Sequence, residues 1–210
     1  KVVRGWLGVN IQDVTNDIAE AMGLSSLKGA LVADVLDDTP AQKAGLKAGD
    51  IIIRLDGDEI ENANELRNDI ALYGADVTVT VTVVRDGKEK SIKVKLGELP
   101  EDDQLASMGG GSGSAGSSDF NGLSVAPVNR TTRDNFQIPN DVDSGVVVTG
   151  IEQGSPAQQT GLQPGDIIME VNRNPVDSID AFKKEYKNAG SNVLLYVYRN
   201  GNRFFRVLKK

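Results

Sequence analysis

The chain contains neither cysteine nor histidine, and only 5% of its residues are aromatic. Without cysteine it can form no disulfide and no thiolate zinc site. Without histidine it lacks the usual proton shuttle, the serine–histidine–aspartate relay and imidazole metal ligands. An enzyme made from this chain would have to use carboxylates or a serine–lysine pair, so we expect no catalytic site, no metal and no cofactor.

Long apolar runs and clusters of basic residues are absent as well. No segment approaches the roughly 18 apolar residues that a membrane-spanning helix needs. The chain has 23 Lys and Arg against 30 Asp and Glu, a net charge of −7, and its basic residues are scattered. We therefore expect no membrane insertion and no nucleic acid partner. The sequence begins at Lys1 without an initiator methionine or a leader, which predicts a fragment or a processed product.

The strongest positive feature is an internal repeat. The segment GALVADVLDDTPAQKAGLKAGDIIIRLDG begins at Gly29, and GVVVTGIEQGSPAQQTGLQPGDIIMEVNR begins at Gly145, which is an offset of 116 residues (145 minus 29). The same offset places Trp6-Leu7-Gly8-Val9 on Gly122-Leu123-Ser124-Val125. A period this long indicates a duplicated domain and not a solenoid unit.

A change in composition separates the two copies. Residues 108–118 read MGGGSGSAGSS, and such glycine- and serine-rich chains behave as random coil. We predict a first domain at residues 1–98, a flexible linker at 99–119 and a second domain at 120–210. The linker is either a plain spacer or a regulatory or cleavable segment.

Each copy shows the same order of strand and helix patterns. In the first copy, residues 6–13, 30–36 and 50–55 read as strands, and residues 77–84, VTVTVTVV, alternate like a half-buried strand. Asp86-Gly87 then predicts the turn of a hairpin that continues to residue 96. Several short strands with two helices in about 95 residues predict a small α+β barrel-like domain.

Two short helices are predicted from their end signals. Thr39 and Pro40 open one helix and Gly45 closes it, following the preferences of helix caps. Asn62 and Glu65 predict a capping box at the start of another, in which each side chain accepts from the backbone of the other.

The repeated motif and the opening segment resemble the PDZ family, in the bacterial form carried by HtrA/Deg serine proteases. TPAQKAGLKAGDII at residues 39–52 and SPAQQTGLQPGDII at 155–168 are similar to that family's most recognisable segment. RGWLGV at residues 4–9 is similar to the segment that joins the protease domain to its first PDZ domain. The resemblance covers both copies and leaves out the linker. It implies two PDZ-like, partly open β-barrel or sandwich domains capped by helices, a protease domain in the parent chain and a periplasmic location.

Within the motif, we interpret Asp50 as a scaffold residue that accepts hydrogen bonds from nearby backbone donors. Function is expected elsewhere, since PDZ recognition adds a ligand strand to a sheet edge and captures its terminal carboxylate in a loop of converging N–H groups. In the first copy Leu7-Gly8-Val9 resembles the carboxylate loop, and the ligand would end in an apolar residue. The predicted peptide-binding residues of the first copy are Arg4, Trp6, Leu7, Gly8, Val9, Asn10, Ile11, Leu66 and Ile70.

The sequence also supports plainer interpretations of these residues. Leu7, Ile11, Leu66 and Ile70 fit the core of a small barrel, and Arg4 fits a solvated surface position as well as a role in attracting the carboxylate. In the second copy the offset puts Ser124 in place of Gly8 and larger side chains on the helix, so we expect weaker or different binding there. The corresponding residues are Leu123, Ser124, Val125, Phe182 and Tyr186.

Several partners agree with this pattern. The tandem is predicted to capture C-terminal or extended segments of unfolded envelope proteins for the protease domain of its own parent chain. The alternative is an assembly module that contacts PDZ domains of neighbouring subunits. A signalling scaffold without a protease is a weaker alternative.

Overall fold

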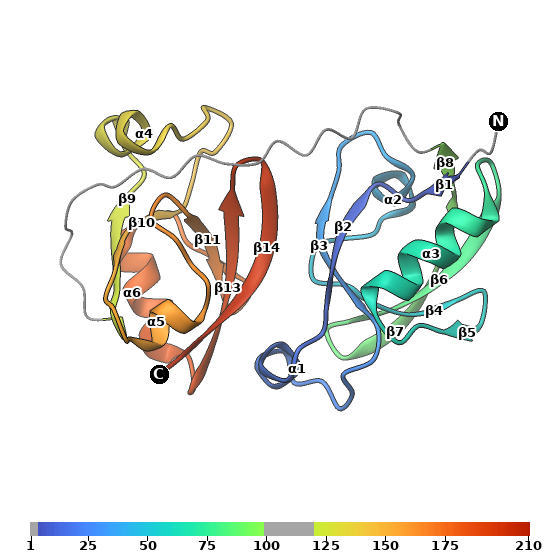
Figure 1. Ribbon diagram of the computed structural model, residues 1–210, viewed down its shortest axis with the longest axis horizontal. Coiled ribbons are helices and arrows are strands. Elements are labelled where there is room, and N and C mark those ends of the chain that lie inside the picture. The colour runs from blue at the N-terminus through green and yellow to red at the C-terminus, as the bar shows by residue number, and fades with distance from the viewer. Residues whose placement is uncertain (1–3, 99–119) are drawn as a thin grey trace. The chain divides into compact units, whose positions relative to one another are not determined.

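The computed structural model describes residues 4–98 and 120–210, which form two compact units (Figure 1). One unit holds strands β1–β8 and the other holds strands β9–β14. The predicted linker at residues 99–119 lies outside the described residues. In the part of the chain that is described, no helix has both the length and the apolar character needed to cross a membrane.

The first unit is built on an antiparallel sheet with β2 as one of its outer strands. The strands follow the order β2 (Val9–Asp13), β3 (Ala30–Val35), β4 (Ile51–Leu55), β6 (Thr78–Arg85) and β7 (Lys88–Lys95). A short β5 (Asp58–Glu59) pairs with β4, and β1 (Gly5–Trp6) pairs with β8 (Gly97–Glu98). The single strand predicted over residues 6–13 is wrong, because the chain turns at Gly8, where φ is +78°, between β1 and β2.

The second unit repeats this topology. Its strands follow the order β9 (Leu123–Pro127), β10 (Val146–Ile151), β11 (Ile167–Val171), β13 (Asn192–Arg199) and β14 (Asn202–Lys209), with β12 (Asn174–Pro175) beside β11. Like β2, β9 is an outer strand of its sheet. The predicted α+β class and the duplication are both confirmed.

Each unit carries the two predicted helices and one more. The predicted ones are α2 (Pro40–Ala44), α3 (Ala63–Tyr73), α5 (Pro156–Gln159) and α6 (Ile179–Asn188). The additional ones, α1 (Asn16–Met22) and α4 (Arg130–Phe136), each follow the first strand of the main sheet. Both are only seven residues long, too short for a helical repeat of apolar residues to stand out in the sequence.

The helix caps agree with the sequence in most respects. The Thr39 side chain accepts from the N–H of Gln42, and Gly45 adopts the left-handed conformation that ends α2. The Asn62 side chain accepts from the N–H of Glu65 as predicted. The return bond was predicted wrongly, because the Glu65 carboxylate accepts at 2.6 Å from the N–H of Glu61, one residue before the cap.

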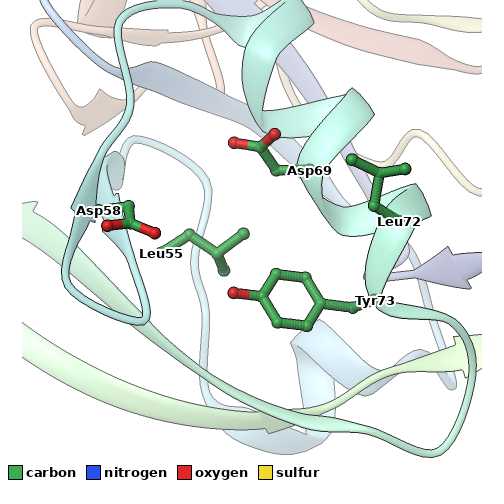
Figure 2. A pocket seen from close by; sticks show the side chains of 5 residues that line it. All are labelled: Leu55, Asp58, Asp69, Leu72 and Tyr73. Atoms are coloured by element: carbon green, nitrogen blue, oxygen red, sulfur yellow. The ribbon is translucent and has the colours of Figure 1, made fainter.

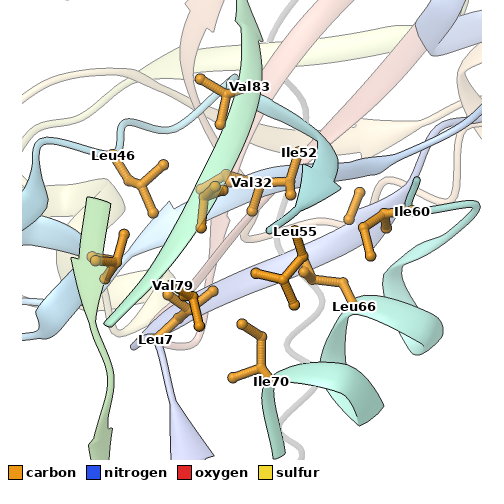
Figure 3. Close-up of a cluster of buried hydrophobic side chains, with 14 of the residues drawn as sticks. Leu7, Val32, Leu46, Ile52, Leu55, Ile60, Leu66, Ile70, Val79 and Val83 are labelled. Carbon is orange, nitrogen blue, oxygen red and sulfur yellow. The ribbon is translucent and has the colours of Figure 1, made fainter. Parts of the chain in front are cut away.

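Each unit has its own apolar core on one side of its sheet. In the first unit, Leu7, Leu66 and Ile70 belong to one cluster of buried side chains with the inward-facing residues of the sheet (Figure 3). In the second unit, Phe182 and Tyr186 belong to the equivalent cluster, and Phe120 joins them. A separate small cluster on the second sheet packs against Phe136 of α4.

A buried ion pair links the repeated motif to the last hairpin of each unit. Asp50 is 1% exposed and accepts from the N–H of Lys47 at 2.9 Å and from Arg85 Nε and Nη2 at 2.7 and 2.6 Å. Arg85 also donates to the carbonyl of Gly45, at the end of α2. Asp166 and Arg199 repeat this arrangement in the second unit. The predicted backbone bond of Asp50 is confirmed, and the arginine is a partner that the prediction missed.

Replacing Asp50 by alanine is expected to destabilise the first unit by about 1.5–3 kcal/mol, because it removes the charge-assisted hydrogen bonds from Arg85 and leaves the N–H of Lys47 without its acceptor. Trp6 is the single tryptophan of the chain and lies in this unit, so its fluorescence during urea unfolding reports the change. The control is Lys95→Ala, which removes an exposed ion pair with Asp76 and should cost less than about 1 kcal/mol. Equal unfolding midpoints for the two variants would contradict a structural role of the buried pair.

Candidate peptide-binding groove

The loop before β2 is bonded to the start of α2 through its carbonyl groups. The carbonyl of Leu7 accepts from the N–H of Ala41 at 2.9 Å, and the carbonyl of Gly8 accepts from the N–H of Leu36 at 3.0 Å. In a planar trans peptide the C=O and the next N–H point in opposite directions. The N–H groups of Gly8 and Val9 therefore point away from α2 and β3, toward the open edge of β2.

Gly8 lies where no other residue fits easily. Its φ is +78°, and a Cβ built on it would lie 2.3 Å from the Cβ of Thr39. The Thr39 hydroxyl donates to the carbonyl of Leu36 at 2.6 Å, which fixes the side chain against the glycine. The helix cap and the tight loop are thus one packed arrangement.

The two strands on either side of this loop, β1 and β2, contact α3 at opposite ends of the helix. The Asp13 carboxylate, at the end of β2, accepts from the N–H of Ala63 at the start of α3. At the other end, Gly5 approaches α3 so closely that a Cβ would lie 2.4 Å from the carbonyl of Ile70. Because β2 is the last strand of its sheet, its outer edge has no strand partner among the described residues.

The predicted residues of the first unit occupy three kinds of position. Arg4 is exposed, Trp6 and Asn10 are half-buried, and Val9 and Ile11 are half-buried against the core. Leu7, Leu66 and Ile70 are 4%, 1% and 5% exposed, so they are core residues of the first unit (Figure 3). The structure thus brings loop, strand and helix residues together in one apolar cluster. Whether a ligand reaches this cluster stays a prediction.

The second unit also has a glycine in the loop before its first sheet strand. The constant offset of 116 residues places Ser124 there instead. A Cβ on Gly122 would lie 2.2 Å from the Cβ of Ser155, and the carbonyl of Gly122 accepts from the N–H of Glu152. Ser155 is the equivalent of Thr39, so Gly122 is the equivalent of Gly8, and the offset here is 114 residues (122 minus 8). The strand registers agree, since Val9 pairs with Val35 and Leu123 pairs with Ile151. The interpretation of Ser124 as the replacement for Gly8 is wrong; Ser124 matches Asn10.

The true equivalent of Trp6 is Phe120, and it changes the groove. Its ring packs edge-on against Phe182 and Tyr186, with both centroids 5.0 Å away. Phe182 is 0% and Tyr186 8% exposed, and burial raises the pKa of the Tyr186 hydroxyl. The carbonyl of Phe120 also accepts from the N–H of Leu123, the equivalent of the Val9 N–H. Aromatic side chains thus fill the space between β9 and α6, and the N–H of Leu123 already has a hydrogen-bond acceptor.

The remaining predicted residues of the second unit lie on β9. Leu123 and Val125 are buried in the core, and Ser124 is half-buried. Phe120 was missed because the constant offset placed Gly122 on Trp6. Aligning the two loop glycines would have revealed the aromatic residue two positions before Gly122.

A different hollow lies against α3 in the first unit, away from the predicted residues. It has a volume of about 330 Å³ and is lined by Leu55, Asp58, Asp69, Leu72 and Tyr73. In Figure 2 the Tyr73 ring lies between α3 and β5, next to Leu55. A hydrogen bond with Asp56 raises the pKa of the Tyr73 hydroxyl. None of the residues predicted for the groove lines this hollow.

Comparison with known proteins agrees with the fold. The family model described as PDZ domain matches residues 5–96 and again 122–204. Probable periplasmic serine endoproteases, described as DegP-like, from Pseudomonas fluorescens and Bartonella henselae are 38% and 41% identical over 100% and 97% of this chain. The chain spans only 43% and 40% of their lengths. Both relatives are named periplasmic, in agreement with the predicted location.

Solved structures give partial matches. A chain described as the HtrA-type protease AlgW with decapeptide is 33% identical, with a TM-score of 0.45, over 48% of this chain and 31% of its own. The two segments that match the family model are both PDZ domains, and neither is a protease domain. The chain therefore belongs to the PDZ family, with two PDZ domains in tandem like those of DegP-like serine endoproteases.

Proposed function

We propose that the first unit binds the C-terminal end of a polypeptide by adding it as a strand to the edge of β2. The observation that carries this proposal is the direction of the Gly8 and Val9 N–H groups, which point away from α2 and β3 while the carbonyls of Leu7 and Gly8 are bonded inward. Two adjacent N–H groups at the end of an unpaired strand edge match the needs of a terminal carboxylate.

The last side chain of the ligand would enter between β2 and α3. Val9 and Ile11 border that space on the strand, and Ile70 borders it on the helix. These side chains are aliphatic, so the pocket favours ends such as Phe, Leu, Val or Met. Arg4 is exposed in front of β1 and adds a positive charge on the approach of the carboxylate.

The wider role follows from the relatives. We propose that the parent chain carries a serine protease domain and that the tandem captures apolar C-terminal ends of unfolded envelope proteins for it. Such ends are exposed in unfolded chains and buried in folded ones, so a module that binds them selects unfolded substrates. The two units on one chain raise the effective concentration for a second contact.

Oligomer assembly is the second candidate function. The observation that favours it is the exposed apolar group at the end of α3, where Leu72, Tyr73 and Val77 are 84%, 36% and 38% exposed. Exposed apolar groups of this kind often mark protein contacts. Sizing chromatography discriminates the two: a monomer that binds peptide favours capture, and an oligomer that Leu72→Glu dissociates favours assembly.

Amidation of the ligand tests the carboxylate loop directly. A peptide with a free C-terminal leucine should shift the backbone amide signals of residues 8–13, and its amidated form should bind about 10–100-fold more weakly, because charge-assisted hydrogen bonds contribute about 1.5–3 kcal/mol. The measurement is a titration of the ¹⁵N-labelled chain. The proposal fails if the two peptides bind with the same Kd.

Replacing Gly8 by alanine tests the loop from the side of the protein. The new Cβ would collide with Thr39 at a positive φ, so we expect loss of peptide binding in the first unit. Gly87→Ala is the matched control, since its φ is +74° and a Cβ there meets nothing within 4 Å. The control should cost about 1–2 kcal/mol of stability from backbone strain alone and keep the Kd. Unchanged binding in Gly8→Ala would show that the loop does not hold the carboxylate.

A further inference from the structure

The second unit has a hollow at the start of β9. Its lining carries more positively charged side chains than the equivalent positions of the first unit. Its volume is about 420 Å³, and Phe120 and Asn121 line it on one side. Lys183, Tyr186 and Lys187 of α6 line the other side, together with Lys210. The hollow therefore lies between the loop that precedes β9 and the second half of α6.

Three lysines make this hollow basic in a chain whose net charge is −7. Lys183 and Lys187 are one helical turn apart, both are exposed, and neither forms an ion pair with a carboxylate in the described residues. Lys210 Nζ donates to the carbonyls of Tyr186 and Ala189 and lies 4.7 Å from the centre of the Tyr186 ring. Glu185, on the same helix, is bonded elsewhere, to Asn174.

The equivalent positions of the first unit are far less basic. Leu96 and Lys210 are equivalent, because each donates its N–H to the residue just before the hairpin's first strand, Val77 in one unit and Ser191 in the other. Leu96 is a core residue with 1% exposure. On the helix, Arg67 and Ala71 correspond to Lys183 and Lys187 (an offset of 116). These three positions thus carry one cation in the first unit and three in the second.

The space for an apolar ligand end is also absent in the second unit. Phe120, Phe182 and Tyr186 fill it with their own rings. The N–H of Gly122 still points outward, because the carbonyl of Asn121 accepts from the N–H of Ala157. The edge of β9 has no strand partner in the described part of the chain. A strand added to this edge would direct its end into the basic hollow.

We infer that the second unit binds polypeptides that end in acidic residues, with the carboxylates of the last residues held by Lys183 and Lys187 and the strand added to the edge of β9. This inference rests on the strand addition of the proposed function but assigns a different ligand chemistry to the second unit. Charge complementarity selects an acidic end over an apolar one. The adjacent unpaired edge selects a peptide over a small free anion.

The test uses the full chain labelled with ¹⁵N and a peptide that ends in Asp-Glu. The peptide should shift the amide signals of residues 122–126, and Lys183→Glu with Lys187→Glu should weaken its Kd at least about tenfold, since attraction becomes repulsion. The control, Lys88→Glu with Lys90→Glu, makes the same change in net charge at exposed lysines of β7 in the first unit and should leave the Kd unchanged. If the double glutamate variant does not fold, Lys183→Gln with Lys187→Gln replaces it.

Two further ligands separate the possible failures. A leucine-ended peptide should bind the first unit with the same Kd in all variants, and inorganic phosphate should not displace the acidic peptide at equal concentration. The inference is wrong if the acidic peptide does not bind while the leucine peptide does, or if the lysine variants leave its Kd unchanged. Displacement by phosphate alone would overturn it in favour of a free-anion site. Failure of both peptides would instead overturn strand addition itself.

Discussion

The contact between a buried aspartate and an arginine positions the glycine loop before the first sheet strand of each unit through a short series of hydrogen bonds. Arg85 bonds both Asp50 and the carbonyl of Gly45, so it holds the end of α2 against the last hairpin. The start of α2 in turn holds the carbonyl of Leu7. The direction of the loop's N–H groups therefore depends on a charge pair at the opposite end of a five-residue helix. The repeated Gly-Asp of the motif is thus linked through α2 to the loop that holds Gly8.

The fold was largely predictable because its signals are local. Alternating strands, cap residues and hairpin turns act over a few residues, and the repeat doubled each of them. The loop alignment failed because its determinant is not local. The tight approach of Gly8 to Thr39 joins residues 31 apart (39 minus 8), and such contacts, together with the strand registers, show that Gly122, beside Ser155, is the equivalent glycine. The second copy has two more residues between its first two sheet strands, so a single offset cannot serve both the motif and the loop.

The candidate site was predictable to a smaller degree for the same reason. The loop, the β2 edge and the α3 residues were identified from the family resemblance, and they do lie together. Arg85 was missed because nothing near Asp50 in the sequence indicates its partner, which comes from the hairpin 35 residues later. Lys210 was missed because its equivalent, Leu96, is an ordinary core residue. Lys210 donates to carbonyls at the end of α6, and this contact can be recognised only when the positions of both the lysine and the helix are known.

The comparison of the two units separates the parts of the scaffold that are constrained from those that are free to change. The ion pair, the capped α2 or α5 and the loop glycine form one set of mutually dependent contacts, and both units keep all of them. The side chains that differ between the units, such as Trp6 and Phe120 or Leu96 and Lys210, take part in none of those contacts. Duplication can therefore alter ligand chemistry at low cost in stability. The proposed aliphatic groove of the first unit and the basic hollow of the second agree with that independence, since Phe120 packs against α6 while the outer edge of β9 keeps no strand partner in the described residues.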